Sequence, residues 1–537
     1  MKEAVFDFIC RMTGGNKEVA ELCAETVGTI KEGDVCLSLN DKQRLLLEGV
    51  KDVASFVEDA PPPASVRTPF VVAGGLLYTR RNWVYERRVR DWVAGRVADK
   101  RTDEVAKLPD DPFYAKLNDE QRAAVTAMCN AKFSILTGGP GTGKTYTIAR
   151  AVKFVHDLCP GLRLGLAAPT GKAKARMNDS LGQALKGERI DVAPATTIHS
   201  LLGPNQNFVT FRHNRVNPLS LDWLIVDEAS MIDLPLMAKL LDALPDECRL
   251  TLVGDADQLA SVERGRVFGD LCLFPGVSVS RLWKSTRFES DGDIAKLSAA
   301  VNGNDADGTL AILRGRSDAV SYFDLSGLPR EDIFDPAKWP EFKKRIQDGF
   351  KDFAESKTVK DALAHLNDFR VLCAQRHGPF GSEQIARWIK KTLDRKCPIP
   401  IMVTRNDRGL EIENGDVGVV LPDNRNILHL SETKTVRLEL LPNPELAFAS
   451  TVHKAQGSQF TDVAIVLPPN PSKKKARTDD KGEAEGEAEA DSFKLLTREI
   501  LYTAITRTEK TVAIWGSEDA IRHCAEHATE RVSGLVP

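Results

Sequence analysis

Residues 133–155, FSILTGGPGTGKTYTIARAVKFV, decide the fold of this chain. An apolar run of strand length leads into a glycine-rich loop, and a helical pattern follows directly. Glycines let backbone N–H groups turn toward phosphate oxygens, Lys144 supplies a cation for the β- and γ-phosphates, and the Thr145 hydroxyl suits Mg²⁺. A glycine-rich turn without a ligand is the alternative, and the flanking strand and helix argue against it. The stretch therefore predicts a phosphate-binding loop in an α/β domain.

The alternation of strand-like and helical patterns continues beyond this loop. Apolar runs of strand length separated by helical patterns predict a parallel sheet with helices on both faces. The same texture returns after about residue 365, which predicts a second α/β domain. The runs are FSIL at 133–136, LRLGLAA at 162–168, WLIV at 223–226, RLTLV at 249–253, FRVLCA at 369–374, TDVAIVL at 461–467 and TVAIWG at 511–516.

Two further strand ends carry polar groups suited to nucleotide chemistry. LIVDE at 224–228 ends in paired acids. Asp227 can hold the hydration shell of Mg²⁺, and Glu228 can orient the attacking water or accept its proton. An ordinary acidic helix start is the alternative. LVGDADQL at 252–259 places the amide of Gln258 where it can sense a γ-phosphate, although the same pattern taken alone is a turn.

A fourth polar segment precedes the phosphate-binding loop. LNDEQ at 117–121 stands before a helix start, and Gln121 could hydrogen-bond an adenine edge. A helix-capping segment is the simpler interpretation of these residues alone. The phosphate-binding loop by itself does not separate kinases, transporters, switches and motors, so the choice depends on the whole set of motifs.

Composition bounds the class of protein. The 537 residues predict three to four domains. Lys plus Arg total 73 and Asp plus Glu 76, a net charge of −3, which excludes a protein that holds nucleic acid by bulk charge. The ten cysteines form no CxxC pair and are expected to be reduced thiols. Glu3 and Asp7 interrupt any secretion signal, so we expect an intracellular, cytoplasmic protein.

The chain divides into three predicted domains. Residues 1–108 are expected to form a small α-rich domain that docks a partner, with two short strands around Gly74 and Gly75. Residues 109–280 and 281–537 are expected to form the two α/β domains. Within the second, residues 403–447 predict a small β-barrel insertion of the SH3-like kind, and the charged residues 470–491 predict a disordered surface loop.

The ordered motifs resemble those of the superfamily 1B helicases and, among these, of the RecD family of subunits of the RecBCD (exonuclease V) enzyme. Segments 78–86, 371–381 and 400–420 are similar to RecD as well, so the resemblance covers most of the chain. The motifs are LNDEQ at 117–121, GGPGTGKT at 138–145, APTGKAKARM at 168–177, TTIHSLLG at 196–203, IVDEASMID at 225–233, LVGDADQLASVERGRVFGDL at 252–271, WKSTRF at 283–288, STVHKAQGSQF at 450–460 and YTAITRTEK at 502–510. The 470–491 loop and Thr508-Glu509 depart from the family pattern.

The resemblance implies two RecA-like P-loop domains with ATP and Mg²⁺ between them. Lys144, Glu228, Gln258, Arg287 and Arg507 would be catalytic, the two arginines serving as fingers that neutralise transition-state charge. Metal ligation would fall to Thr145 and Asp227. The implied ATP-binding residues are Gln121, Gly138, Gly139, Pro140, Gly141, Thr142, Gly143, Lys144, Thr145 and Gly457.

The resemblance also implies contacts to single-stranded DNA. These residues offer hydroxyls, amides and cations to phosphates, as a motor that must not read sequence requires. The implied contacts are Pro169, Thr170, Gly171, Lys172, Thr197, His199, Thr451, His453 and Lys454. His199 and His453 are equally well explained as hydrogen-bonded structural residues.

The function expected from the resemblance is ATP-dependent 5′→3′ translocation and unwinding of DNA, as the RecD-like subunit of a helicase-nuclease acting in double-strand-break repair and recombination. Its implied partners are DNA ends and RecB-like and RecC-like subunits, and no nuclease constellation is visible in the chain. A stand-alone helicase, a regulatory subunit that binds ATP without unwinding, and a small-molecule kinase are the alternatives. The kinase leaves Gln258, Arg507 and the second α/β domain unexplained.

Overall fold

The computed structural model places most of the chain. It describes residues 2–57, 66–98, 108–188, 190, 192–205, 210–261, 263–284, 292–315, 317–326, 335–394, 396–407, 409–469, 493 and 495–536. The loop expected at 470–491 lies outside these residues. Two compact units form: the first contains residues 1–256, 260–283 and 530–537, and the second contains 257–259 and 284–529. Residues 530–537, assigned from sequence to the second α/β domain, thus belong with the first unit.

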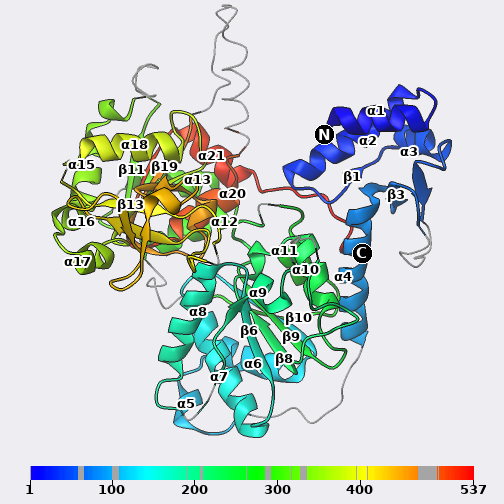
Figure 1. Ribbon diagram of the computed structural model, residues 1–537, viewed down its shortest axis with the longest axis horizontal. Helices are drawn as coiled ribbons and strands as arrows, with labels where there is room; N and C mark the ends of the chain where they lie inside the picture. The colour runs from blue at the N-terminus through cyan, green and yellow to red at the C-terminus, as the bar shows by residue number, and fades with distance from the viewer. Residues whose placement is uncertain are drawn as a thin grey trace, which may run out of the picture. The chain divides into compact units, whose positions relative to one another are not determined.

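The first unit is built around a parallel sheet of six strands in the order β10-β5-β9-β8-β6-β7. Helices from opposite sides cover it (Figure 1). Successive residues of β8 alternate between two cores: Leu224 and Val226 face one, Trp223 and Ile225 the other. The elements are α5 Pro112–Ala115, α6 Asp119–Asn130, β5 Phe133–Gly138, α7 Lys144–Leu158, β6 Leu164–Ala168, α8 Gly171–Ala184, β7 Thr196–Thr197, α9 Ile198–Leu202, β8 Trp223–Val226, α10 Leu234–Asp242, β9 Arg249–Gly254, α11 Val267–Leu273 and β10 Ser278–Leu282.

The second unit repeats this plan with a five-stranded parallel sheet, β11-β20-β19-β12-β18. Val463 and Ile465 of β19 face one core, and Ala464 and Val466 face the other. All seven strand-length runs predicted from sequence form strands. The elements are α12 Asp293–Asn302, α13 Ala306–Gly315, β11 Val320–Asp324, α15 Pro340–Gly349, α16 Lys351–Glu355, α17 Val359–Ala364, β12 Phe369–Cys373, α18 Ser382–Thr392, β18 Ala449–Thr451, β19 Phe460–Val466, α20 Arg498–Ile505, β20 Thr508–Gly516 and α21 Glu518–Glu526.

A second, antiparallel sheet is inserted into this unit. It has five strands in the order β16-β15-β14-β13-β17 and its own small core, which includes Leu428 and Val436. The strands are β13 Ile399–Met402, β14 Val417–Val420, β15 Ile427–His429, β16 Thr435–Arg437 and β17 Glu445–Leu446. The insertion thus begins a few residues before the predicted 403. Closure of this sheet into an SH3-like barrel stays a prediction.

The N-terminal residues form a helix-rich domain that also contains a small sheet, with more strands than the two predicted. Helices α1 Lys2–Met12, α2 Lys17–Glu32 and α3 Asp41–Glu48 pack on a four-stranded sheet in the order β1-β4-β3-β2, with β1 Leu37–Ser38 and β2 Ala54–Phe56. The predicted hairpin is confirmed, because β3 Phe70–Ala73 pairs antiparallel with β4 Leu76–Thr79. Gly74 and Gly75 make the turn with φ of 58° and 78°, angles that favour glycine.

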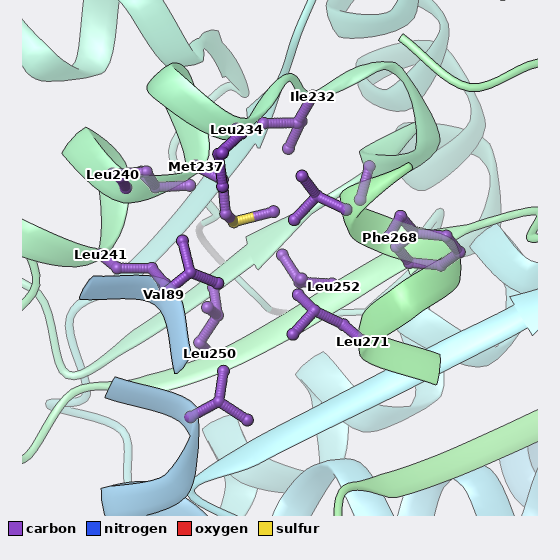
Figure 2. Packing of buried hydrophobic residues seen from close by; sticks show 14 of the residues in the cluster. Val89, Ile232, Leu234, Met237, Leu240, Leu241, Leu250, Leu252, Phe268 and Leu271 are labelled. Carbon is purple, nitrogen blue, oxygen red and sulfur yellow. The ribbon is translucent and has the colours of Figure 1, made fainter. Parts of the chain in front are cut away.

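Helix α4, Arg80–Ala98, joins the N-terminal domain to the first parallel sheet. Its Trp83, Val89 and Val93 are buried in the same hydrophobic core as residues of β8, β9 and α10. Figure 2 shows Val89 close to Leu241 and Leu250. Deleting the helix would expose this face of the sheet to water, since each large side chain buried there contributes about 1.5–3 kcal/mol. The segment that links the N-terminal domain to the sheet therefore also covers part of that sheet.

The last residues of the chain contact both the N-terminal domain and the hydrophobic core of the first unit. Val532 exchanges hydrogen bonds with the end of α2: Val35 N–H donates to its carbonyl at 3.0 Å, and its own N–H donates to Asp34 Oδ1 at 2.9 Å. Gly534 N–H donates to Glu86 Oε2 at 3.0 Å, and Leu535 is 1% exposed. Because the tail packs on the N-terminal domain and on the core, it stabilises both together.

None of the described helices is long and apolar enough to span a membrane.

Glu86 of α4 makes the stability of this unit depend on pH. Burial raises the pKa of Glu86 from 4.5 to about 7, against the opposing hydrogen bonds from Tyr78 and Gly534. Below pH 4.5 the carboxyl is neutral in both states, and as pH rises through 7 the folded state must ionise it. Its stabilising contribution is therefore lost over this window, by on the order of 2–3 kcal/mol.

We expect Glu86→Gln, which mimics the neutral acid, to flatten this pH dependence. Urea unfolding of wild type and variant between about pH 5 and pH 8 measures it, and the difference isolates Glu86 from other groups that titrate there. Equal pH slopes for the two proteins would show that Glu86 is ionised in the fold.

Candidate functional site

The phosphate-binding loop lies at the carboxyl end of β5, between β10 and β9. Gly141 and Gly143 adopt φ of 79° and 85°, so the loop curls in a conformation that side chains other than glycine rarely adopt. Helix α7 begins at Lys144, directly after the loop. The first N–H groups of a helix lack acceptors within it and point at an anion placed there. The loop and helix therefore form a phosphate cradle.

The ammonium of Lys144 folds back over this loop. It donates to the carbonyls of Gly138 at 2.7 Å and Gly139 at 3.1 Å. These carbonyl oxygens hold the cation above the cradle, where phosphate oxygens are the stronger acceptors because they are charged. Lys144 is thus positioned for the role predicted from sequence.

Gln121 connects a helix cap to the loop. Asn118 and Gln121 form a reciprocal capping box at the start of α6, which confirms the capping interpretation. The side-chain amide of Gln121 also donates to the carbonyl of Thr142 at 3.3 Å. A Cβ on Gly143 would lie 2.6 Å from Gln121 Nε2, so a larger residue here would push this amide away, and the φ of 85° would strain it as well. Gln121 therefore supports the loop directly, and its contact with adenine stays a prediction.

The two acids predicted to act on Mg²⁺ and water follow β8. Asp227 Oδ1 accepts the N–H of Glu228 at 2.8 Å. Glu228 has φ of 51°, a left-handed conformation that costs free energy in a residue with a side chain and marks functional sites. Burial and the neighbouring Glu228 raise the pKa of Asp227 to about 6, against the opposing charge of Lys144.

These oxygen donors fit Mg²⁺. The raised pKa of Asp227 shows that the nearby positive charge does not fully offset its burial, and a hard divalent cation would add the charge that is needed. The Thr145 hydroxyl lies at the start of α7, and its role as a further oxygen ligand stays a prediction.

In the second unit, Arg507 is held by three acceptors. It follows α20 and is 2% exposed. Its guanidinium donates to Gln258 Oε1 at 2.8 Å, to the carbonyl of Thr503 at 3.2 Å and to that of Ser458 at 3.4 Å. Gly457, with φ of 73°, immediately precedes Ser458. The structure thus brings together three predicted ATP-site residues, Gln258, Gly457 and Arg507, while Arg287 lies outside the described residues.

The residues of the first unit that are predicted to contact the DNA meet at one edge of its sheet. Ala168 at the end of β6 pairs with Thr197 of β7, so Pro169, Thr170 and Lys172 lie near Thr197 and His199. Thr170 and Thr197 cap α8 and α9 through bonds of 3.2 Å from Ala173 and Ser200 N–H groups. Both hydroxyls therefore have a structural role, whatever they contact besides.

His199 presents an exposed imidazole at this edge. Its ring lies 5.8 Å from that of Phe211. Desolvation first, and the charge of Lys239 second, hold the pKa of His199 below its usual value. The ring is therefore neutral at physiological pH and available as a hydrogen-bonding or stacking group.

The residues of the second unit that are predicted to contact DNA lie at the end of β18 and directly after it. Thr451 ends this strand, its hydroxyl accepts the N–H of Lys454 at 3.3 Å, and His453 lies between them. Lys454 Nζ forms an ion pair with Glu445 at 2.6 Å, and Arg376 binds the other oxygen of Glu445 at 2.9 Å. Sequence reasoning had not singled out Arg376 or Glu445. Arg376 could have been found, because it lies in the RecD-like segment 371–381.

The fold and the site together define the class of protein to which this chain belongs. A strand, a glycine-rich loop and a helix that together cradle phosphate, with an acid at the end of another strand of the same sheet, characterise P-loop nucleoside triphosphatases. The model of the AAA domain family matches residues 121–264, which contain all of these parts.

Relatives identify the family. "RecBCD enzyme subunit RecD" of Mycolicibacterium smegmatis is 35% identical, over 86% of this chain and 82% of that protein. The Haemophilus influenzae protein of the same name is 31% identical, over 90% of this chain and 82% of that one. "ATP-dependent RecD2 DNA helicase" of Deinococcus radiodurans is 28% identical, over 77% of this chain and 51% of that protein. This chain belongs to the RecD family, as its motifs predicted.

Proposed function

We propose that this chain is an ATP-dependent DNA helicase that translocates 5′→3′ as the RecD subunit of a RecBCD enzyme in double-strand-break repair. Membership of the RecD family supports the subunit assignment. The observation that carries the motor assignment is the phosphate-binding loop of the first unit, with Lys144 over it and Asp227 at a strand end of the same sheet. The first unit holds the phosphate cradle and Asp227, and the second holds Arg507 on Gln258.

This division explains why hydrolysis can produce movement. Lys144 and the N–H groups of α7 bind the phosphates, and Glu228 orients the attacking water. Bound Mg²⁺ would neutralise charge on the β- and γ-phosphates, with Thr145 and Asp227 as its ligands. Arg507 exchanges its carbonyl and amide acceptors for the γ-phosphate, so it acts on the transition state. Each cycle of ATP hydrolysis then alters the DNA contacts of one unit relative to those of the other.

Lys144→Gln tests the motor directly. The variant keeps the length of the side chain but removes the phosphate cation, so DNA-stimulated ATP hydrolysis should fall by on the order of 10²-fold or more. Lys153 lies on the same helix and pairs with Asp157 at 2.8 Å, so Lys153→Gln is the control and should keep near-normal turnover. Comparable turnover in both well-folded variants would refute the assignment of the loop.

Arg507→Ala separates the finger role from nucleotide binding. Turnover should fall roughly 10³-fold, whereas nucleotide affinity should change only a few-fold, because a finger acts on transition-state charge. Stopped-flow hydrolysis and binding of a fluorescent nucleotide measure the two quantities. The control is Arg522→Ala, an exposed arginine of the same unit that pairs with Asp307. Loss of binding with unchanged turnover of bound ATP would contradict the finger role.

Unwinding of duplexes with a single-stranded tail decides polarity and mechanism together. The proposed motor opens a duplex with a 5′ tail and not one with a 3′ tail. ATP hydrolysis without unwinding of either substrate, in the purified chain and in its native complex, would instead support the regulatory subunit.

The N-terminal domain is the proposed docking surface for the RecC-like subunit. Helix α1 exposes Phe8 to 49% and Met12 to 38%, while Ile9 between them is buried in the domain core. Large apolar side chains exposed on one helix are typical of a protein interface. Helix α4 shares a hydrophobic core with the first parallel sheet. Deleting residues 1–105 would therefore disturb that sheet as well as the docking surface, so point variants are needed to test docking.

We expect the double variant Phe8→Ser, Met12→Ser to weaken assembly with co-expressed RecB-like and RecC-like subunits by about tenfold or more, as loss of interface anchors does. Leu158 on α7 is 58% exposed, and Leu158→Ser is the control. Titrated pull-down with the tagged RecC-like subunit measures the affinity. If the double variant formed as much heterotrimer as the wild-type chain, the docking surface would lie elsewhere.

A further inference from the structure

Two cations of the second unit lie at one edge of its parallel sheet. Cys373 at the end of β12 pairs with Thr451 at the end of β18. Arg376 and Lys454 each follow three residues later, so both leave the sheet at the same end. Carboxyl ends of neighbouring parallel strands are where α/β sheets bind ligands. Only Lys454 was expected to contact DNA.

One carboxylate bridges the two cations. Glu445 Oε2 lies 2.6 Å from Lys454 Nζ, and Glu445 Oε1 lies 2.9 Å from a terminal nitrogen of Arg376. Glu445 comes from β17 of the inserted antiparallel sheet, where it pairs with Met402 of β13. Its side chain is 19% exposed, so the carboxylate is mostly enclosed by its two partners while the cations remain accessible. The insertion thereby supplies an anion to a surface built by the parallel sheet.

A second carboxylate pairs with Arg376 and with a third cation, Arg387. Glu383 at the start of α18 accepts Arg376 Nε at 2.8 Å and lies 3.6 Å from Arg387. Desolvation raises the pKa of Glu383, but the hydrogen bond and charge of Arg376 outweigh it, so the pKa lies below its usual value. Three permanent cations, Arg376, Arg387 and Lys454, thus face two carboxylates. The net charge of about +1 attracts an anion, and the anion gains the two nitrogen atoms that bind Glu445 where that carboxylate yields.

We propose that Arg376 joins Lys454 in binding one backbone phosphate of the DNA strand, and that Glu445 is the internal anion that the phosphate displaces. This inference rests on the proposed function and assigns a further contact and a positioning residue to it. A phosphate offers two oxygens to two cations, as the Glu445 carboxylate does. When the strand leaves, Glu445 reoccupies its place, so Lys454 and the terminal nitrogen of Arg376 regain an anionic partner. Release of DNA, which each step of a motor requires, therefore costs less free energy than it would without Glu445.

Glu445→Gln tests the displacement. Without the competing charge, single-stranded DNA should bind about two- to fivefold more tightly at low salt, the range expected for one partly exposed ion pair. The gain should shrink between about 50 mM and 200 mM salt as screening increases. The matched control is Glu439→Gln: it lies on the same insertion, changes net charge equally, and pairs only with the exposed Arg437 at 3.5 Å among the described residues. Fluorescence anisotropy with a labelled oligonucleotide measures both affinities.

Arg376→Gln supplies the second measurement. It should weaken DNA binding several-fold and reduce the slope of log affinity against log salt by about 0.7, the loss of one single-strand phosphate contact. Arg437→Gln is its control. Affinity of Glu445→Gln equal to or weaker than that of Glu439→Gln would overturn the proposal, as would an unchanged salt slope for Arg376→Gln. If wild type itself neither binds single strands nor hydrolyses ATP in response to them, the proposed function fails instead.

Discussion

The direction shared by the strands of a parallel sheet is the constraint on which this molecule depends. Because all carboxyl ends emerge at one edge, loops far apart in sequence meet there. In the first unit that edge gathers the phosphate cradle after β5 and the acids after β8. In the second it gathers Arg376 after β12 and Lys454 after β18. Short loops therefore suffice to assemble sites from four separate segments.

At the candidate sites the cations are held by internal acceptors. Lys144 lies on two loop carbonyls, Arg507 on Gln258 and two carbonyls, and Lys454 on Glu445. An unpaired buried charge would cost several kcal/mol, so a site that must bind and release anions needs a partner for its cations in both states. Neutral carbonyls bind such cations more weakly than a phosphate does, so the exchange favours the ligand when it is present.

The N-terminal domain and the last residues show a different use of packing. Helix α4 shares a core with the first sheet, and Val532 and Gly534 close the arrangement from the other end of the chain. Burial of Glu86 in this region raises its pKa, which destabilises the contact as the carboxyl ionises. The same domain still exposes Phe8 and Met12 on α1. One small domain can thus serve the stability of the ATPase core and carry a surface for a partner.

The sequence by itself determined the family, the two parallel sheets, the hairpin at Gly74 and the position of the phosphate-binding loop. The sheets, the hairpin and the loop depend on local patterns, since an apolar run or a glycine acts within a few residues of itself, whereas the family depends on the order of nine motifs along the chain. Tertiary structure alone decided that Glu445 pairs with Arg376 and Lys454, that Gln258 accepts from Arg507, and that residues 530–537 return to the first unit. Apart from Glu445 and Lys454, which are nine positions apart, these contacts join residues that are tens to hundreds of positions apart. Side-chain proximity across such distances is set by the strand order and packing of the whole unit, which no local pattern encodes.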